Sequence, residues 1–368
     1  MIPRLPDYGH GSLADLLPSI GAQFGVPNAA DVIGLPQAEQ YVVVLIDGLG
    51  AQLLDDHADH APYLASLRGR RLTSGVPSTT ATSITSLGTG LTPGRHGLAG
   101  YSFWYPPSGQ VLATLRWPAE VSALDVQPQL TYFERLQAAG VATSVVAPAH
   151  FDGSGLSTAA LRGPTFLPVH DESDRNRRVG LAEQALQLGR QAVCYLYERN
   201  LDHAGHERGA GSSAWLRRLA EVDALAQALR AALPAEAVLL ITGDHGMVNV
   251  PKHNRLIVED EPELLTGVTA LAGEGRFRQL MTAQPQAVAA RWRDRLGERA
   301  WVRTREEAEA EGWFGSLSPS LAPRFGDVLV ACSDDGAVMT RALPREMALV
   351  GMHGSLTAAE MEIPLLIG

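Results

Sequence analysis

The sequence predicts an α/β fold in which a mostly parallel central sheet is flanked by helices on both faces. Short apolar runs rich in β-branched residues alternate with stretches of helical periodicity, which is the pattern of repeated strand–helix units. The 368-residue chain is 45% hydrophobic and 19% charged, so it has enough apolar material for a large core. We therefore expect residues 1–368 to form a single α/β domain that carries a smaller inserted α+β subdomain.

The expected strands are short and strongly apolar, as is typical of sheets that are buried on both faces. They lie at 41–47, 141–148, 192–197, 237–244 and 327–332, with a weaker candidate at 361–368. Helices are expected at 129–139 and 213–232, where apolar side chains recur with helical spacing. This alternation is the basis for predicting a parallel sheet.

Residues 251–325 differ from the rest of the chain. They carry charged stretches of helical character at 258–267 and 304–315, and their strand signals are weaker. We expect an inserted, cap-like subdomain at 251–325, after which the chain returns to the central sheet.

Charge and cysteine usage limit the classes of function. A formal net charge of −10 argues against binding a nucleic-acid polymer, which needs clustered basic residues. Cys194 and Cys332 both lie in apolar runs, so we expect buried thiols and a reducing compartment. The N-terminal residues lack a signal-peptide pattern, and no apolar run reaches the roughly 18 residues of a membrane span. We expect a cytoplasmic protein that acts on a small molecule rather than at a membrane.

Metal-ligand side chains follow the ends of several expected strands, which is where open α/β sheets form their sites. They are Asp47, the pair Asp202 and His206 at helical spacing, the adjacent Asp244 and His245, and His353 near the C-terminus. Each alone is a common turn or surface pattern, but their conjunction predicts two clusters of ligands. Imidazole with carboxylate suits zinc, with manganese or iron as alternatives, whereas all-oxygen coordination would suit magnesium.

Residues 76–90, VPSTTATSITSLGTG, contain eight hydroxyl side chains. Pro77 marks a turn, and residues 80–88 have a helical pattern. Hydroxyls are favourable at helix N-termini, where unpaired amides and the positive end of the helix dipole also attract a phosphate or an alkoxide. Without the ligand residues, a capped turn would be the preferred interpretation.

Together these motifs resemble the alkaline phosphatase superfamily, and most closely its type I phosphodiesterase/nucleotide pyrophosphatase branch. The elements DG, TGLTPGRHG, DHAGHERG, GDHGM and MHGS occur in the order that the family uses and span residues 41–366. The resemblance implies an alkaline phosphatase-like fold. It also implies metal-dependent hydrolysis of phosphodiester or pyrophosphate bonds in nucleotide-type substrates, through a covalent phospho-threonine.

The resemblance assigns the nucleophile to Thr80, nine positions before Thr89, with the adjacent Thr79 as the fallback. One divalent metal ion would be held by Asp47, Asp244, His245 and Thr80. The other would be held by Asp202, His206 and His353, with Thr80 between the two ions. We expect His203 to be no ligand and His96 to be structural.

One position departs from the family pattern. An Asn that contacts a phosphate oxygen is usual a few residues after the HG of PGRHG, and this chain has Tyr101 there. The Tyr101 phenol could still donate a hydrogen bond to substrate. Tyr101 also opens the aromatic run 101–107, which either forms a stacking wall for a base or aryl group or packs as a hairpin.

Two alternatives remain beside the phosphodiesterase interpretation. A phosphomonoesterase or phosphonate hydrolase would use the same two-metal core, and a protein of another class would bind nucleotide or metal without catalysis. A sulfatase is disfavoured because no cysteine lies near residue 80. A phosphoglycerate mutase-like enzyme is disfavoured because it would usually carry a serine at the nucleophile position.

Overall fold

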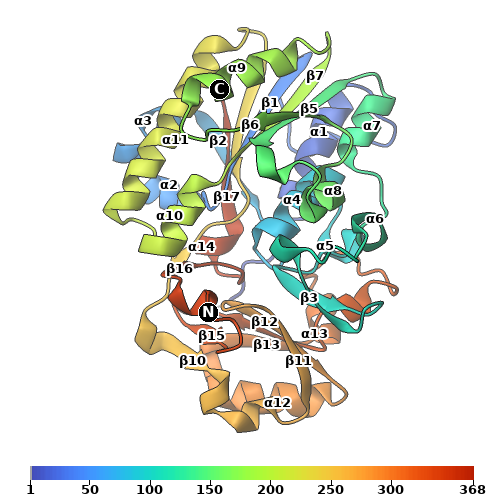
Figure 1. Ribbon diagram of the computed structural model, residues 1–368, viewed down its shortest axis with the longest axis vertical. Helices are drawn as coiled ribbons and strands as arrows, with labels where there is room; N and C mark the ends of the chain where they lie inside the picture. Colours follow the sequence, from blue (N-terminus) through green and yellow to red (C-terminus); the bar gives the residue numbers. More distant parts are fainter. Residues whose placement is uncertain (1) are drawn as a thin grey trace.

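The computed structural model describes residues 2–368 and has a central mixed sheet with helices on both faces (Figure 1). Within this range the main sheet has seven strands in the order β2-β17-β8-β1-β7-β5-β6. Their bounds are β1 Gln40–Ile46, β2 Arg68–Thr73, β5 Ala142–Pro148, β6 Thr165–Val169, β7 Ala192–Glu198, β8 Val238–Gly243 and β17 Glu362–Ile367. β17 pairs antiparallel with both its neighbours, and the other pairings are parallel. The predicted fold class is confirmed.

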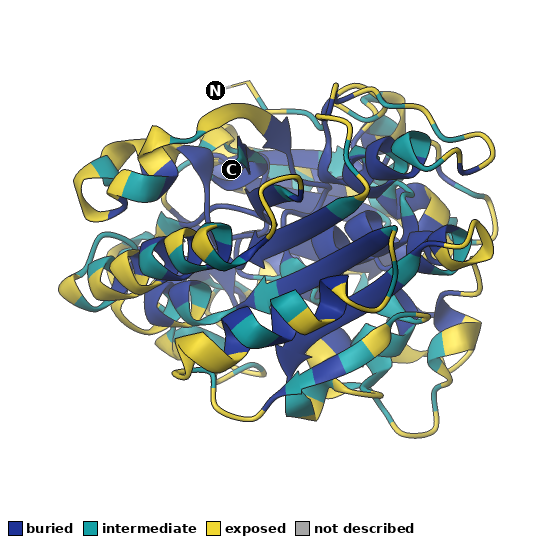
Figure 2. Ribbon diagram, turned by 90° about the horizontal axis from the view of Figure 1, so that it is seen from above, coloured by how far each residue is buried: buried dark blue, intermediate teal, exposed yellow. Residues whose placement is uncertain are grey.

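Alternate residues of β1 belong to two different cores, which shows how the sheet is covered. Tyr41, Val43 and Leu45 pack in one core with side chains of α1 (Leu16–Gln23), α4 (Thr80–Thr89), α7 (Tyr132–Ala138) and α8 (Gly155–Leu161). Val42, Val44 and Ile46 pack in the other, with α9 (Arg175–Leu186) and α11 (Ser213–Ala232). The buried strands between partly exposed helices are visible in Figure 2. The sheet is therefore buried on both faces, as its apolar strands require.

A second sheet lies beyond one end of the central sheet, at the bottom of Figure 1. It has four antiparallel strands in the order β11-β12-β14-β13 within the described residues. Their bounds are β11 Val268–Glu274, β12 Phe277–Thr282, β13 Ala300–Thr304 and β14 Val328–Cys332, and α12 Pro285–Leu296 packs against them. The charged stretches flank this sheet: 258–265 forms only short 3-10 turns, and 304–315 contributes α13 Arg305–Ala310.

The prediction for 327–332 is wrong in one respect. The segment is a strand, but it pairs with β12 and β13 in the second sheet instead of returning to the central sheet. All five residues of β14 are buried, as in the central strands, because α12 covers one face of its sheet and the core covers the other. An apolar run in the sequence predicts that a strand is buried, but it does not predict which sheet the strand joins. The division into domains stays a prediction.

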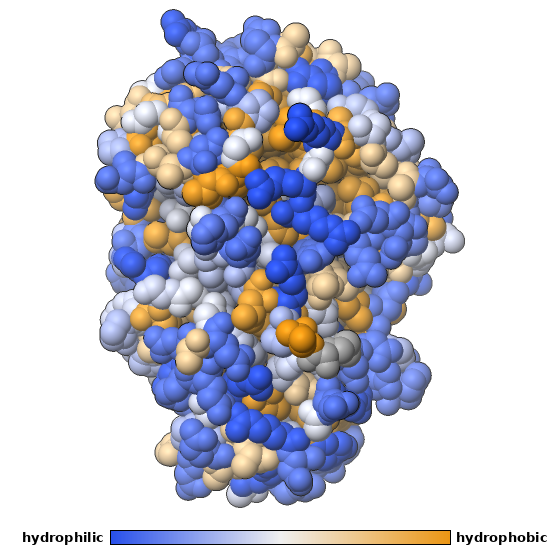
Figure 3. All heavy atoms as spheres, turned by 180° about the vertical axis from the view of Figure 1, so that it is seen from behind, coloured by the Kyte–Doolittle hydropathy of each residue, from blue (hydrophilic) through white to orange (hydrophobic). Residues whose placement is uncertain are grey.

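The surface and the thiols agree with the composition. Figure 3 shows one face of the molecule on which apolar residues form scattered patches among hydrophilic ones. Cys194 and Cys332 are buried and unbridged, as expected. No helix within residues 2–368 combines the length and the apolar character needed to cross a membrane.

Candidate metal centre

Two acidic residues meet because they follow neighbouring parallel strands. β1 pairs with β8 in a register that sets Ile46 opposite Gly243, so Asp47 and Asp244 leave the sheet side by side. The amide of Gly48 donates to Asp244 Oδ1 at 3.0 Å. Gly48 has φ +74°, and a Cβ there would lie 3.0 Å from the Asp202 Cβ. Glycine is needed after Asp47 both for this left-handed turn and for the close approach of Asp202.

The other ligands come from a helix and a loop at the same edge. α10 (Asn200–Arg208) begins directly after β7, the other neighbour of β1, and Asp202 Oδ2 lies 3.3 Å from His206 Nε2 one turn later. His353 follows β16 (Gly351–Met352), which pairs antiparallel with β9 (Val248–Asn249) just beyond Asp244 and His245. The three segments therefore converge at the ends of β1, β7 and β8.

The six predicted ligand residues form two groups. In each group the possible ligand atoms all lie within 4.8 Å of one another. We call Asp47, Asp244 and His245 the first ligand group, and Asp202, His206 and His353 the second ligand group. The rings of His245 and His353 stack with their centroids 3.7 Å apart, so the two groups are adjacent.

The histidines hold their protons on the side away from the ligand groups. Each Nδ1 faces a backbone carbonyl: His206 that of Gly351 at 2.8 Å, His245 that of Gly246 at 2.9 Å, and His353 that of Ser78 at 3.0 Å. A carbonyl can only accept, so each Nδ1 carries the hydrogen and each Nε2 presents a lone pair. The Nε2 atoms of His206 and His353 lie 3.3 Å apart. Such lone pairs suit a shared cation.

The carboxylates point to the same conclusion. Asp202 Oδ1 and Asp244 Oδ2 are buried without a hydrogen-bond partner among residues 2–368. Burial and the nearby Asp244 and Asp202 raise the pKa of Asp47 well above its usual value, and burial also raises the pKa of Asp244. Burial and the two other histidines lower the pKa of His353. Divalent cations would compensate the clustered charge and the orphaned oxygens, so the residues present fit two metal ions.

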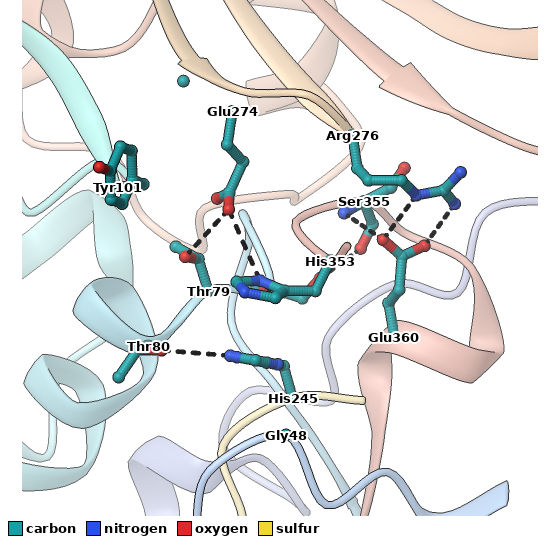
Figure 4. Close-up of polar contacts among 12 residues, drawn as sticks. Gly48, Thr79, Thr80, Tyr101, His245, Glu274, Arg276, His353, Ser355 and Glu360 are labelled. Carbon is teal, nitrogen blue, oxygen red and sulfur yellow. Dashed lines mark hydrogen bonds and ion pairs between the residues drawn. The ribbon is translucent and has the colours of Figure 1, made fainter. Parts of the chain in front are cut away.

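The structure distinguishes the two candidate threonines. Thr80 is the first residue of α4, and its Oγ1 lies 3.2 Å from His245 Nε2 and 3.4 Å from Asp47 Oδ1 (Figure 4). The Oγ1 of Thr79 instead donates to Glu274 Oε2 at 3.4 Å. Thr80 therefore faces the first ligand group from a helix N-terminus, and Thr79 faces away from it.

The other hydroxyls of residues 76–90 have structural partners. Thr85 and Thr89 each donate to the carbonyl four residues earlier in α4, at 2.7 and 2.6 Å. Gly88 allows α4 to approach α8, because a Cβ there would lie 2.0 Å from the carbonyl oxygen of Ala160. These residues pack and satisfy the helix behind Thr80.

The two remaining histidines of the motifs lie outside the ligand groups. His203 is exposed. His96 is buried, where its Nδ1 accepts from the Leu98 amide at 3.1 Å and its Nε2 lies 3.0 Å from Ser86 Oγ. Burial lowers the pKa of His96 to about 3, so it is neutral and structural in this environment.

The aromatic run packs as a hairpin. β3 (Ser102–Tyr105) pairs with β4 (Gln110–Ala113), and Phe103 and Tyr105 are buried in the core, so they form no wall for a ligand. Tyr101 precedes the hairpin, and burial raises the pKa of its half-buried phenol. In Figure 4 it lies beside Glu274.

Sequence reasoning missed the cavity beside Thr80. This cavity of about 670 Å³ is lined by Thr80 and by several aromatic residues. They are Trp117, Phe151, Phe166, Tyr195 and Tyr197. The hydroxyl of Tyr197 also donates to Asp47 Oδ2. The signal that could have found Tyr195 and Tyr197 is the alternation of β7, which places both side chains on one face.

Sequence reasoning also missed Glu274, which reaches the site from β11. It lies between two glycines in a segment without any recognised motif. Nothing near it in the sequence connects it with Thr79 or His353.

Comparisons with known proteins agree with this geometry. Residues 41–356 match the family model described as type I phosphodiesterase / nucleotide pyrophosphatase. Comparison with curated protein sequences gives no match.

Solved structures of two proteins illustrate the similarity of fold. Murine ectonucleotide pyrophosphatase/phosphodiesterase 5 superposes with a TM-score of 0.70 at 17% identity, covering 89% of this chain and 87% of that one. An inactive variant of that murine protein was solved in complex with AMP. Phosphonoacetate hydrolase from Sinorhizobium meliloti 1021, in complex with phosphonoformate, has a TM-score of 0.69 at 20% identity, with 90% of each chain covered.

Proposed function

The chain belongs to the type I phosphodiesterase/nucleotide pyrophosphatase family of hydrolases, and from that premise we propose that it hydrolyses phosphodiester or pyrophosphate bonds of nucleotide-type substrates through a covalent phospho-Thr80. The observation that carries the proposal is the position of Thr80 Oγ1, within 3.4 Å of Asp47 and His245 of the first ligand group. A threonine hydroxyl needs such activation because its own pKa lies far above neutrality.

In this proposal the six ligand side chains hold two divalent metal ions, most simply Zn²⁺, with Mn²⁺ or iron as alternatives. When bound, such ions lower the pKa of the attacking oxygen and neutralise charge on the phosphoryl group. Elemental analysis of purified protein tests the metal: we expect two transition-metal ions per chain, and magnesium alone would contradict the zinc assignment.

The residues of the chain then carry out two displacements. Thr80 Oγ1 bonds to phosphorus while the bond to the leaving ester oxygen breaks, and the hydroxyl proton passes to solvent. Water next attacks the phosphorus while its bond to Thr80 Oγ1 breaks; the phosphoryl product leaves, and Oγ1 takes up a proton from that water. Thr80 is the first residue of α4, so a phosphoryl group bonded to it lies at the N-terminus of this helix. The unpaired amides and the positive end of the helix dipole there would stabilise the negative phosphoryl oxygens.

The aromatic cavity supports a substrate with a bulky organic group. It opens beside Thr80, and its Trp117, Phe151 and Tyr197 side chains offer flat apolar surfaces. AMP in the complex of the murine neighbour is a ligand of this kind. A nucleoside group in the cavity would leave the phosphoryl group next to Thr80.

Steady-state hydrolysis of bis(p-nitrophenyl) phosphate and p-nitrophenyl phosphate by zinc-loaded protein tests the proposal. We expect the diester to be preferred and Thr80→Ala to lose activity by roughly 10³-fold or more, because the nucleophile is gone. Thr79→Ala removes the fallback hydroxyl and should retain far more activity than Thr80→Ala, with only a modest loss because Thr79 also donates to Glu274. Full activity of Thr80→Ala would overturn the covalent mechanism.

Phosphonate hydrolysis is the second candidate. It is favoured by one observation, that the phosphonoacetate hydrolase structure has a coverage and a TM-score similar to those of the murine structure. Phosphate release from phosphonoacetate, with no p-nitrophenol release from bis(p-nitrophenyl) phosphate, would select it. Tightly bound metal without turnover of any of these substrates would instead indicate a non-catalytic binding protein.

A further inference from the structure

The second sheet places a carboxylate directly behind His353. Glu274 is the last residue of β11, and its Oε2 lies 3.6 Å from His353 Nδ1 (Figure 4). The same oxygen accepts a hydrogen bond from Thr79 Oγ1 at 3.4 Å. The Glu274 side chain is only 12% exposed. The carboxylate therefore lies on the Nδ1 side of the ring, away from the Nε2 that faces the second ligand group.

The backbone next to His353 is shaped to admit this carboxylate. Gly354 has φ +123°, and a Cβ at that position would lie 2.9 Å from Glu274 Cγ and 3.1 Å from its Oε1. Any larger residue at 354 would displace Glu274 or strain the loop. The loop that carries His353 thus packs on the carboxyl group itself.

A buried ion pair fixes the same turn to the same loop. Arg276, two residues after Glu274, is fully buried and contacts both carboxylate oxygens of Glu360, at 3.0 and 2.7 Å. Glu360 also accepts from the Ser355 amide at 3.0 Å. The turn between β11 and β12 is therefore held to the segment after His353, which keeps Glu274 in place.

The other two ligand histidines are supported differently. The carboxylates recorded near His206 and His245 approach Nε2, on the side of the ligand groups, whereas their Nδ1 atoms face backbone carbonyls. A carboxylate behind a ligand imidazole fixes the ring orientation and strengthens the metal-facing nitrogen. His353 has the Glu274 carboxyl group 3.6 Å from its Nδ1, in addition to the Ser78 carbonyl that Nδ1 bonds, so the ring is held from two sides.

We propose that Glu274 is a positioning residue for the second ligand group, holding His353 in the orientation that a divalent cation there requires. The affinity of that group for metal then depends on the docking of the second sheet. The inference rests on the proposed function in one respect, since it takes the second ligand group to bind a metal ion.

Zinc titration of metal-free full-length protein, followed by calorimetry and by competition with a chelating dye, tests the inference without any substrate. We expect wild-type protein to bind two equivalents. Glu274→Ala should weaken one equivalent by about 10- to 100-fold and leave the other unchanged. Glu274→Gln should lose less, because its amide oxygen can still accept from Thr79 Oγ1 and the side chain still fills the space behind His353.

A matched control lies on the same side of the molecule. Glu346 is as little exposed as Glu274 and pairs with Arg278 of β12, but it contacts no ligand residue. Glu346→Gln should bind both equivalents with wild-type affinity. Circular dichroism of each metal-free variant checks that the fold is retained, and the near-isosteric Glu274→Gln gives a readout even if Glu274→Ala folds poorly.

The outcomes separate the two proposals. Two equivalents bound by Glu274→Ala with wild-type affinity, or an equal weakening of both, would overturn the role of Glu274 alone. Failure of wild-type protein to bind two equivalents would overturn the two-metal function, and this inference with it.

Discussion

The two ligand groups use different kinds of support. In the first ligand group, Asp47 and Asp244 directly follow neighbouring parallel strands, and the side chains of Asp244 and His245 are fully buried. In the second ligand group, the ligands lie on α10 and on the loop after β16, and the His206 side chain is 23% exposed. The first group is fixed by the central sheet, whereas the second depends on how a helix, a loop and the second sheet dock together.

We therefore expect the two ligand groups to behave differently. The group that touches Thr80 is the more deeply buried one, so we expect its side chains to move less than those of the second group. The second group is more exposed, so we expect it to exchange a metal ion with solvent more readily. If the difference in burial matters, variants of the two ligand groups should differ in activity, in zinc affinity and in stability.

Removing one ligand from each group should give the largest effect and the clearest contrast. Asp244→Asn should lower kcat/KM by on the order of 10³-fold at any zinc concentration, since a buried carboxylate of the first ligand group is lost, and with it the firm hold on the cation that would neutralise charge in the transition state. His206→Ala should lose activity comparably at low zinc but recover partly as zinc is raised, because its group is more exposed and water can take the vacated ligand position. Activity measured across a zinc series checks this. Equal recovery of both variants would show that the two groups do not differ.

A smaller effect should come from the contact behind the first group. Tyr197 donates to Asp47 Oδ2, so Tyr197→Phe should weaken one zinc equivalent by about 10-fold or somewhat more. Tyr197→Phe should weaken zinc binding at the first ligand group, whereas Glu274→Ala should weaken it at the second ligand group. Zinc titration of the double variant checks this: both equivalents should be weak. A single weakened equivalent in the double variant would mean that both side chains serve the same group.

The smallest expected effect is on the stability of metal-free protein. The pKa values of Asp47 and Asp244 are raised in the folded state, so these residues stabilise the fold fully only below the unfolded pKa of about 4. That stability is lost as pH rises through the folded pKa values. Thermal melts from pH 5 to 8 should therefore show that added zinc raises the melting temperature more at higher pH, and least in Asp244→Asn. A zinc-induced shift that does not depend on pH would contradict the carboxylate cluster as its source.

Most of the site could be predicted because its ligands follow rules that act locally. Asp47 and Asp244 end apolar strands, and parallel strand ends converge at one edge of a sheet. Asp202 and His206 are spaced by one helical turn. The family spacing selected Thr80 over Thr79, and the structure then shows that Thr80 is the one that faces the ligands.

The remaining features depend on contacts between distant segments. Glu274 has no local signature, and its role arises only because the β11–β12 turn docks on the loop of His353. The strand at 327–332 was assigned to the wrong sheet because an apolar run reports burial and not its partner strand. The aromatic cavity is built from four separate segments, so no single stretch of sequence reveals it.

The position of β17 has a consequence for biosynthesis. This strand, close to the C-terminus, inserts between β2 and β8 and pairs with both. Until residues 362–367 have left the ribosome, the central sheet is divided at this point and two strand edges are unpaired. His353 lies just upstream of β17, and its loop is tied through Ser355 and Glu360 to α14 (Ala358–Met361), the short helix that directly precedes this strand. A nascent chain should therefore gain its second ligand group and its full central sheet together, once residues 353–367 have emerged.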